Sequence, residues 1–189
     1  MSRHSLAMEH VWQEDSDLLD ISLMLPRQRC GLACLEMVIG YQLGKAAPAG
    51  EIFQRSKSYQ AINSHNDWWH PGQVRVIASY GLTAWRRNWT APTQDPRYFE
   101  ENEGYLPDQM KAVTQQINSE REIRSDPERF LAAVYASLDR GNPVIVSVKT
   151  GFSDNKENHQ IVLSGYNDDE LTFDIHDPVQ KVGPAVVSE

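Results

Sequence analysis

The chain has 189 residues, of which 40% are hydrophobic and 23% are charged, and its formal net charge at neutral pH is -8. This length and composition suit one compact domain with a buried core and argue against intrinsic disorder. No apolar stretch approaches the roughly 20 residues of a membrane-spanning helix, and no basic cluster is long enough to line a nucleic-acid groove. Neither a membrane nor a nucleic acid is therefore expected as a partner.

The cysteines and the N-terminus bear on the compartment. Cys30 and Cys34 lie only four positions apart and cannot form the disulfide framework of a small secreted protein. The first twenty residues have no continuous apolar segment after their basic residues, so they do not resemble a secretory signal. A reducing, cytoplasmic location is the resulting expectation. Residues 1–20 are predicted to be an N-terminal arm, with the main domain over 21–189.

The first part of the domain is predicted to be helical. The string GLACLEMVIGYQL, between Gly31 and Gly44, carries apolar residues on most faces, which predicts a largely buried helix that ends at the second glycine. A shorter helix is expected within residues 48–66, near EIFQRSKSYQ. A further helix over QVRVIASY is expected to stop at Gly81, and LTAWRRNW to follow as a strand.

The later part changes character. Residues 94–128 are rich in charged and amide side chains and contain three prolines, which predicts a surface insertion or lid with one helix near 108–118. The segment DPERFLAAVYASLDRG then has a proline-started, glycine-stopped helix pattern, and PVIVSV follows as a strand. HQIVLSGY and LTFDIHD are expected to form an antiparallel hairpin across a polar NDDE turn. A helix before a C-terminal antiparallel sheet is an α+β arrangement.

Cys30 stands where the first helix begins, and this position favours a nucleophilic role. The N–H groups and the dipole at a helix N-terminus stabilise a thiolate and lower the pKa of a thiol. Gly31 removes the neighbouring side chain and is expected to let backbone and substrate approach closely. A nucleophilic cysteine also needs an imidazole to take its proton and a carboxylate or amide to orient that imidazole.

The terminal hairpin supplies both partners. His159 has the strand parity of Ile161. Asp177 has the parity of Leu171 and Ile175, so both side chains are expected on the inner face of the hairpin. A turn of three or five residues would bring His159 opposite or nearly opposite Asp177, whereas a turn of two or four residues would break this relation.

The strings RCGLACLEMVIGY, GNPVIVSV and HQIVLSGYNDDELTFDIHDP closely resemble the bacteriocin-processing (double-glycine leader) cysteine peptidases and their papain-like relatives. In that family, Cys-Gly opens a buried helix, a strand begins with the catalytic histidine, and Asp-Pro ends the next strand. The resemblance implies a papain-like fold, with the nucleophile helix packed on the C-terminal antiparallel sheet and with Cys30, His159 and Asp177 as a catalytic triad. It implies that the substrate is a peptide or small amide, cleaved through an acyl-enzyme without a cofactor or metal.

The oxyanion donor departs from the family pattern. Relatives usually place a glutamine about five or six residues before the cysteine, where this chain has Met24 and Leu25. The available amide is Gln28, which in a differently shaped loop is expected to act as oxyanion donor beside the backbone N–H of Cys30. The chain also stops soon after Asp177, where relatives generally continue, which suggests either a compact or a truncated variant.

Three functions stay open at this point. The chain is a cysteine peptidase or amide hydrolase, an acyltransferase that passes the acyl group to an amine, or a catalytically silent relative that binds a peptide. Other chemistry-bearing residues have simpler interpretations: Cys34 is expected in the core, and His65 and His70 in loops, because no second ligand pair stands at metal-binding spacing. The tryptophans are expected to serve packing, and Asp177 could also cap its Asp-Pro turn.

Overall fold

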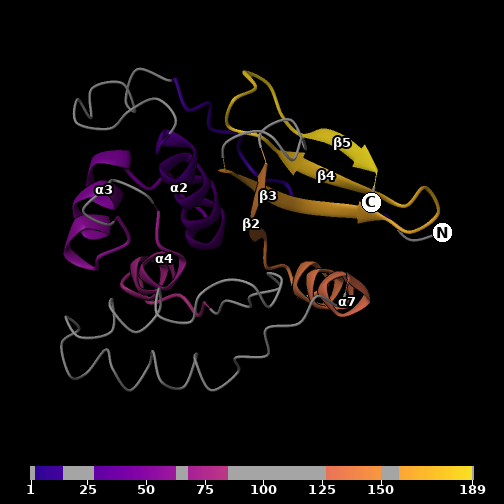
Figure 1. Cartoon of the computed structure of the whole chain (residues 1–189), viewed down its shortest axis with the longest axis horizontal. Coiled ribbons are helices and arrows are strands. Elements are labelled where there is room, and N and C mark those ends of the chain that lie inside the picture. Colours follow the sequence, from indigo (N-terminus) through magenta and orange to yellow (C-terminus); the bar gives the residue numbers. More distant parts are fainter. Residues whose placement is uncertain (1–2, 15–27, 63–67, 85–126, 150–157, 189) are drawn as a thin grey trace.

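The molecule combines helices with a curled antiparallel sheet. The computed structural model describes residues 3–14, 28–62, 68–84, 127–149 and 158–188. Three helices gather on one side of the molecule, the sheet occupies the other, and a fourth helix lies against the sheet (Figure 1). The described helices are α2 (Arg29–Leu43), α3 (Ala49–Ser58), α4 (His70–Ala78) and α7 (Pro127–Leu138). This is the mixed architecture that the order of sequence patterns predicts.

The sheet is built around one long strand. The described strands are β1 (Arg3–Ser5), β2 (Val144–Lys149), β3 (Asn158–Asn167), β4 (Thr172–His176) and β5 (Ala185–Ser188). On one side of β3 lies β4, which pairs in turn with β5. On its other side, β2 pairs with the first part of β3 and β1 with the last part. All these pairings are antiparallel, so the N-terminal residues complete a sheet that is otherwise formed by the C-terminal part of the chain.

Helix α2 lies in the interior of the fold. Nine of its 15 residues are buried, in keeping with its apolar pattern. It begins at Arg29, two residues before the expected start, and ends at Gly44, whose φ of 64 is the left-handed conformation that glycine adopts easily. The N–H of Gly44 closes the helix by bonding to the carbonyls of Gly40 and Tyr41.

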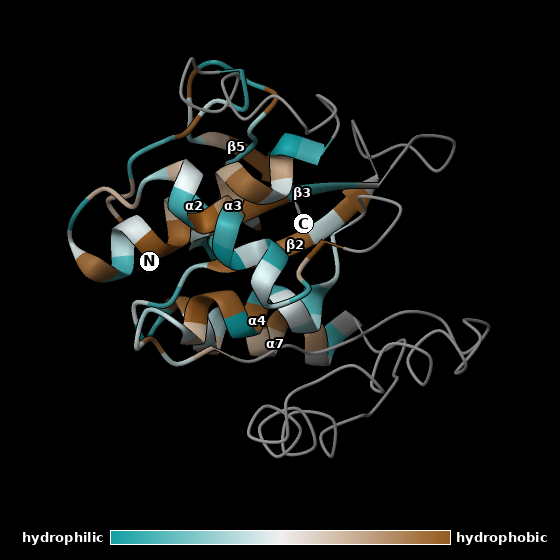
Figure 2. Cartoon of the chain, turned by 90° about the vertical axis from the view of Figure 1, so that its left-hand side faces the viewer, coloured by the Kyte–Doolittle hydropathy of each residue, from teal (hydrophilic) through white to brown (hydrophobic). Residues whose placement is uncertain are grey.

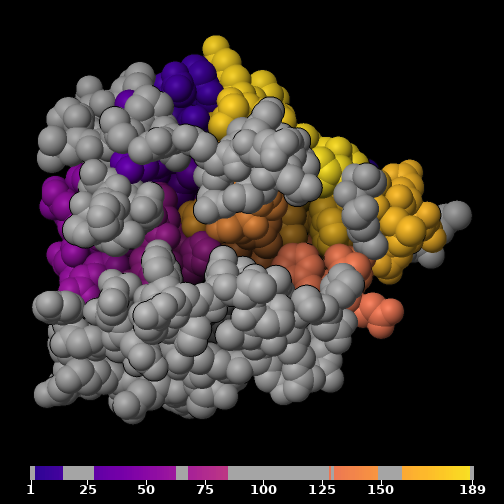
Figure 3. All heavy atoms as spheres, viewed as in Figure 1, coloured from indigo at the N-terminus to yellow at the C-terminus, as the bar shows by residue number. Residues whose placement is uncertain are grey.

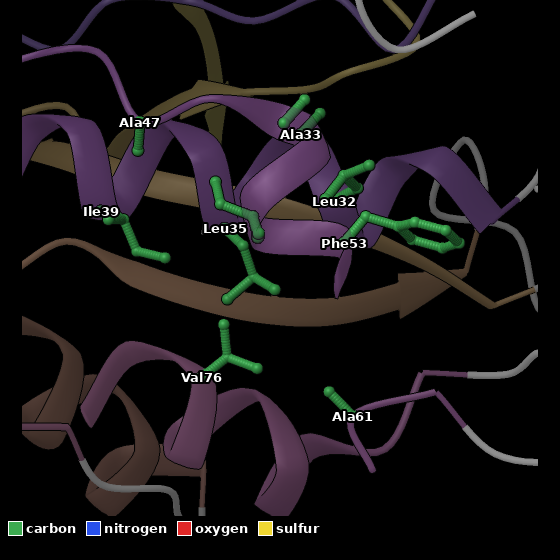
Figure 4. Close-up of a cluster of buried hydrophobic side chains, with 10 residues drawn as sticks. Leu32, Ala33, Leu35, Ile39, Ala47, Phe53, Ala61 and Val76 are labelled. Carbon is green, nitrogen blue, oxygen red and sulfur yellow. The ribbon is translucent and has the colours of Figure 1, made fainter. Parts of the chain in front are cut away.

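Two hydrophobic clusters explain why α2 is apolar almost all round. On one side, Leu35 of α2 packs with Phe53 of α3 and Val76 of α4 (Figure 4). On another side, Cys34 packs near Val162 of β3. A helix that is covered by other helices and by a sheet at once has no face left for polar residues. The hydrophobic residues accordingly lie mainly in the interior of the molecule, whereas α3 carries hydrophilic stretches (Figure 2).

The opposite face of the sheet is covered by α7. Val134 and Leu138 of this helix pack against Ile161 and Leu163 of β3. Residues 161 and 163 alternate with Val162, which faces α2, so the two helices cover opposite faces of the same strand. The sheet is thus buried on both sides where it carries the candidate site.

Most of the predicted elements that fall within the described residues are present, with two differences. Leu171 was expected in the second hairpin strand but belongs to the turn, with a φ of 51 and 57% of its surface exposed. Leu82 to Ala84 form no strand, and the rest of the LTAWRRNW segment lies outside the described residues. The expected insertion at 94–128 also lies outside them, apart from its last two residues, which begin α7. Strands β1 and β5 had no counterpart in the sequence-based prediction.

Candidate active site

Cys30 is the second residue of α2, so its side chain projects from the first turn of a buried helix. Only 3% of its surface is exposed. Helix α2 packs directly on β3. His159, the second residue of β3, lies close enough to form a side-chain hydrogen bond with Cys30.

The other side of the His159 ring is bonded to Asp177. The distance from Nε2 of His159 to Oδ1 of Asp177 is 2.7 Å, and both side chains are largely buried. Asp177 directly follows β4, and its Oδ1 also accepts the backbone N–H of Val179 at 3.0 Å. The carboxylate therefore caps the Asp-Pro turn and contacts the imidazole at the same time, so the two uses considered for it coexist.

The strand register that brings these residues together depends on an irregularity in β3. Asn167 pairs with Thr172, which leaves a turn of four residues, a length expected to separate His159 from Asp177. The register shifts by one residue between Leu163 and Gly165. Such a bulge places one extra residue on one strand. The side chains beyond it therefore point to the opposite face of the sheet from the one that simple alternation would give. The expected condition on turn length was therefore wrong, because the bulge compensates for the fourth turn residue.

The surroundings of His159 favour its protonated form. Burial alone would lower the pKa of His159, but the hydrogen bonds with Asp177 and Cys30, together with their negative charges, raise it to about 9. Burial would likewise raise the pKa of Asp177, yet the bonds from His159 and Val179 and nearby positive charge lower it below its ordinary value. At neutral pH the pair is therefore an imidazolium beside a carboxylate.

Cys34 has a different environment from Cys30, although it lies one turn further along α2. It is fully buried, and burial, followed by the charges of Cys30 and Asp177, raises the pKa of its thiol well above 9.0. A thiol of this kind stays protonated at neutral pH and is a poor nucleophile. The expectation of a core role for Cys34 agrees with its membership of the cluster that joins α2 to β3.

Gln28 and Trp68 shape the entrance to α2. Gln28 immediately precedes the helix and is 4% exposed, and its backbone carbonyl accepts the indole N–H of Trp68. A Cβ at Gly31 would overlap the Trp68 indole. Gly31 was expected to leave room for substrate, but in the structure this space is taken by Trp68. The glycine beside the cysteine was the one available signal that a bulky group approaches there.

Two further pairs connect α4 to the strands near His159. Gln73 and Gln160 exchange side-chain hydrogen bonds of 2.8 and 3.2 Å in the interior. His70 Nε2 lies 2.8 Å from Ser147 Oγ. His70 begins α4 and is no loop residue, whereas His65 lies outside the described residues. In the described part of the chain, no group of three or more histidine, cysteine or acidic residues could hold a metal ion.

The sequence belongs to the Peptidase C39-like family, because the family model matches residues 6–187. This assignment confirms the resemblance carried by the cysteine, histidine and Asp-Pro motifs. The chain is also similar to a crystal structure from Bacillus anthracis that is provisionally assigned as a C39-like peptidase. That match has a TM-score of 0.52 and 13% sequence identity, and covers 100% of this chain and 89% of the other. At this identity the similarity concerns the fold alone.

No curated protein matches the sequence closely enough to serve as a relative. Among the described helices, none has both the length and the apolar character needed to cross a membrane.

Proposed function

We propose that the protein is a cysteine peptidase or amide hydrolase in which Cys30, His159 and Asp177 form the catalytic triad. The observation that supports this most strongly is the position of one imidazole, which bonds to Asp177 at 2.7 Å and to Cys30. Membership of a peptidase family agrees with a peptide as substrate. The packing of α2 on β3 is what a papain-like arrangement requires, because the first element carries the nucleophile and the second carries the base.

The bond of His159 to Asp177 supports different partners for the two ring nitrogens of His159. Nε2 faces Asp177, which leaves Nδ1 for Cys30. The proton of the Cys30 thiol then resides on His159, and the thiolate attacks the carbonyl carbon of the scissile amide to form a C–S bond. As the C–N bond breaks, His159 donates its proton to the leaving amine. Asp177 orients the ring and stabilises the imidazolium throughout.

Deacylation uses the same groups in the reverse order. Water attacks the thioester of Cys30 and gives one proton to His159. The C–S bond breaks, the acid product leaves, and the thiolate–imidazolium pair is restored. An amine in place of water would give acyl transfer, so the same triad serves a hydrolase or an acyltransferase.

Gln28 is our candidate for the side-chain oxyanion donor. It lies two residues before Cys30, it is buried, and it precedes the helix whose N-terminus presents backbone N–H groups toward the thiol. The bond from Trp68 to the Gln28 carbonyl holds the backbone at this point. We assign the carboxamide of Gln28 and the backbone N–H of Cys30 as the pair that receives the developing negative charge.

The test measures the reactivity of one thiol against the other. Iodoacetamide at neutral pH should alkylate Cys30 faster than a free thiol and leave Cys34 almost unmodified, with peptide mapping to locate the label. His159→Ala should slow the labelling of Cys30, and Cys30→Ala should abolish hydrolysis of a mixed peptide library. Ordinary thiol reactivity at Cys30, unchanged in His159→Ala, would rule the proposal out. If hydrolysis is found, competition between water and an added amine separates hydrolase from acyltransferase.

A further inference from the structure

A short N-terminal segment lies against the turn that carries Asp177. The N–H of Gln13 bonds to the carbonyl of Pro178 at 2.9 Å, and the ammonium of Lys181 lies 5.5 Å from the centre of the Trp12 ring. The space-filling view shows the indigo N-terminal residues next to the yellow C-terminal ones (Figure 3). These contacts place residues 10–13, which belong to the predicted N-terminal arm, beside the candidate active site.

His10 makes the most specific of these contacts. Its Nε2 lies 2.8 Å from the carbonyl oxygen of Gln180, and its ring stacks on His176 with centroids 5.5 Å apart. Its Nδ1 lies 3.3 Å from Nδ1 of His176. The ring is also seated against Gly183, where a Cβ would overlap it. The imidazole therefore contacts three residues that follow β3 in the chain.

The protons on the two histidines follow from their partners. A carbonyl oxygen only accepts, so Nε2 of His10 must donate to Gln180. Between the two Nδ1 atoms, one nitrogen donates and the other accepts. His176 is 1% exposed, and burial, followed by the charge of His10, lowers its pKa to about 4. Neutral His176 is therefore one hydrogen-bond partner of the His10 ring, and the Gln180 carbonyl is the other.

Gln180 belongs to the same turn as the candidate catalytic carboxylate. Its N–H bonds to the carbonyl of Asp177 at 2.9 Å, so the two residues are the ends of one four-residue turn. The 2.7 Å bond to His159 and the bond from Val179 fix the direction of the Asp177 carboxylate. A shift of the turn by about 1 Å would weaken the bond to His159, and misplacement on that scale can cost about 100-fold in rate.

We propose that His10 is a positioning residue for the triad: it fixes the Asp177–Gln180 turn through the Gln180 carbonyl and so keeps Asp177 within hydrogen-bond distance of His159. This inference rests on the proposed function, because it assigns His10 a role that acts through Asp177. His10 does not touch the reacting groups. The N-terminal segment is thereby a part of the active-site framework.

The experiment compares three substitutions of His10 in the full chain. His10→Ala removes both contacts, and His10→Asn can reach His176 but is too short for Gln180. His10→Gln places an amide donor near the former Nε2 position. We expect His10→Ala and His10→Asn to lower the pKa of His159 measured by NMR titration, and to lower kcat about 10- to 100-fold with little change in KM. His10→Gln should retain a pKa of His159 and a kcat close to those of the wild type.

His4→Ala is the matched control, since it removes a histidine of the same N-terminal segment that stacks on Tyr166. It should change neither the pKa of His159 nor kcat. A folded His10→Ala protein with the wild-type pKa and kcat would overturn the proposal. If His10→Ala does not fold, the proposal would instead be overturned by an equal pKa of His159 and an equal kcat in His10→Asn and His10→Gln. The NMR titration needs no substrate, so a wild-type protein without peptidase activity would refute the proposed function while the coupling of His10 to His159 is still tested.

Discussion

His159 and Asp177, which are 18 positions apart in the chain, are joined by a 2.7 Å hydrogen bond from Nε2 to Oδ1. This bond has two consequences: it sets the orientation of the imidazole, and it contributes to the raised pKa of His159. Asp177→Asn keeps an oxygen for the N–H of Val179 but removes the charge. We expect kcat/KM to fall by about 100- to 10,000-fold and the pKa of His159 to fall below about 9. Steady-state kinetics with an NMR titration checks both, and an unchanged kcat/KM would exclude Asp177 from the triad.

The pH dependence of hydrolysis should follow the ionisation of His159. The leaving amine takes its proton from the imidazolium, which exists below a pKa of about 9 and is lost as the pH rises through it. We therefore expect kcat/KM to decrease above pH 9. Alkylation of Cys30 by iodoacetamide needs no proton donor, so its rate should not decrease in that range. A parallel decrease of both rates would point to unfolding and not to His159.

Substitutions of Gln28 decide whether this residue is the oxyanion donor. Gln28→Ala removes the amide, and we expect a loss of about 100- to 1000-fold in kcat. Gln28→Glu replaces the amide by a carboxylate that repels the oxyanion, and its loss should be at least as large. The alkylation rate of Cys30 serves as the control, because iodoacetamide generates no oxyanion and the rate should stay close to wild type. Hydrolysis by Gln28→Ala within about twofold of wild type would remove Gln28 from the mechanism.

The contact between Gly31 and Trp68 predicts a stability effect. A methyl group at Gly31 would overlap the indole, so Gly31→Ala should lower the free energy of unfolding by about 1–3 kcal/mol in urea denaturation. Gly50 of α3 is a matched control, because a Cβ there meets nothing within 4 Å, and Gly50→Ala should be neutral or slightly stabilising. In a Trp68→Ala background, where the indole is absent, Gly31→Ala should cost less than in the wild type. Equal stability of the two glycine variants would contradict this packing.

His176 should make stability depend on pH in mildly acidic solution. Its pKa is about 4 in the folded protein and 6.5 ordinarily, so the unfolded chain binds more protons between these values. The contribution of neutral His176 to the free energy of unfolding is complete above pH 6.5 and is lost as the pH falls toward 4. At pH 4.5 the loss is about 2–3 kcal/mol. Urea denaturation at pH 7 and pH 4.5 measures this loss. His176→Phe should reduce the difference between the two pH values, and an unchanged difference would assign it to other groups.

Local patterns in the sequence were sufficient for much of the fold. Helix α2 is apolar on most faces because it is buried between helices and sheet, and the glycine that ends it adopts the left-handed conformation. The hairpin of β3 and β4 follows from its alternation and turn residues. The choice of Cys30, His159 and Asp177 as candidate catalytic residues rested on a helix start, two strand motifs and the resemblance of these motifs to a peptidase family. These features depend on residues that are close together in the chain, and a sequence pattern reflects relations over such short distances.

Only the tertiary structure decided how these pieces meet. The bulge near Ser164 corrects the register that a four-residue turn would otherwise produce, and alternation alone does not reveal it. The indole of Trp68 occupies the space above Gly31, and His10 contacts the turn after Asp177 from the far end of the chain. These contacts join residues that are about 37 to 170 positions apart. Their energies depend on which surfaces face each other after folding, so the sequence determined the catalytic candidates and the packing determined their alignment.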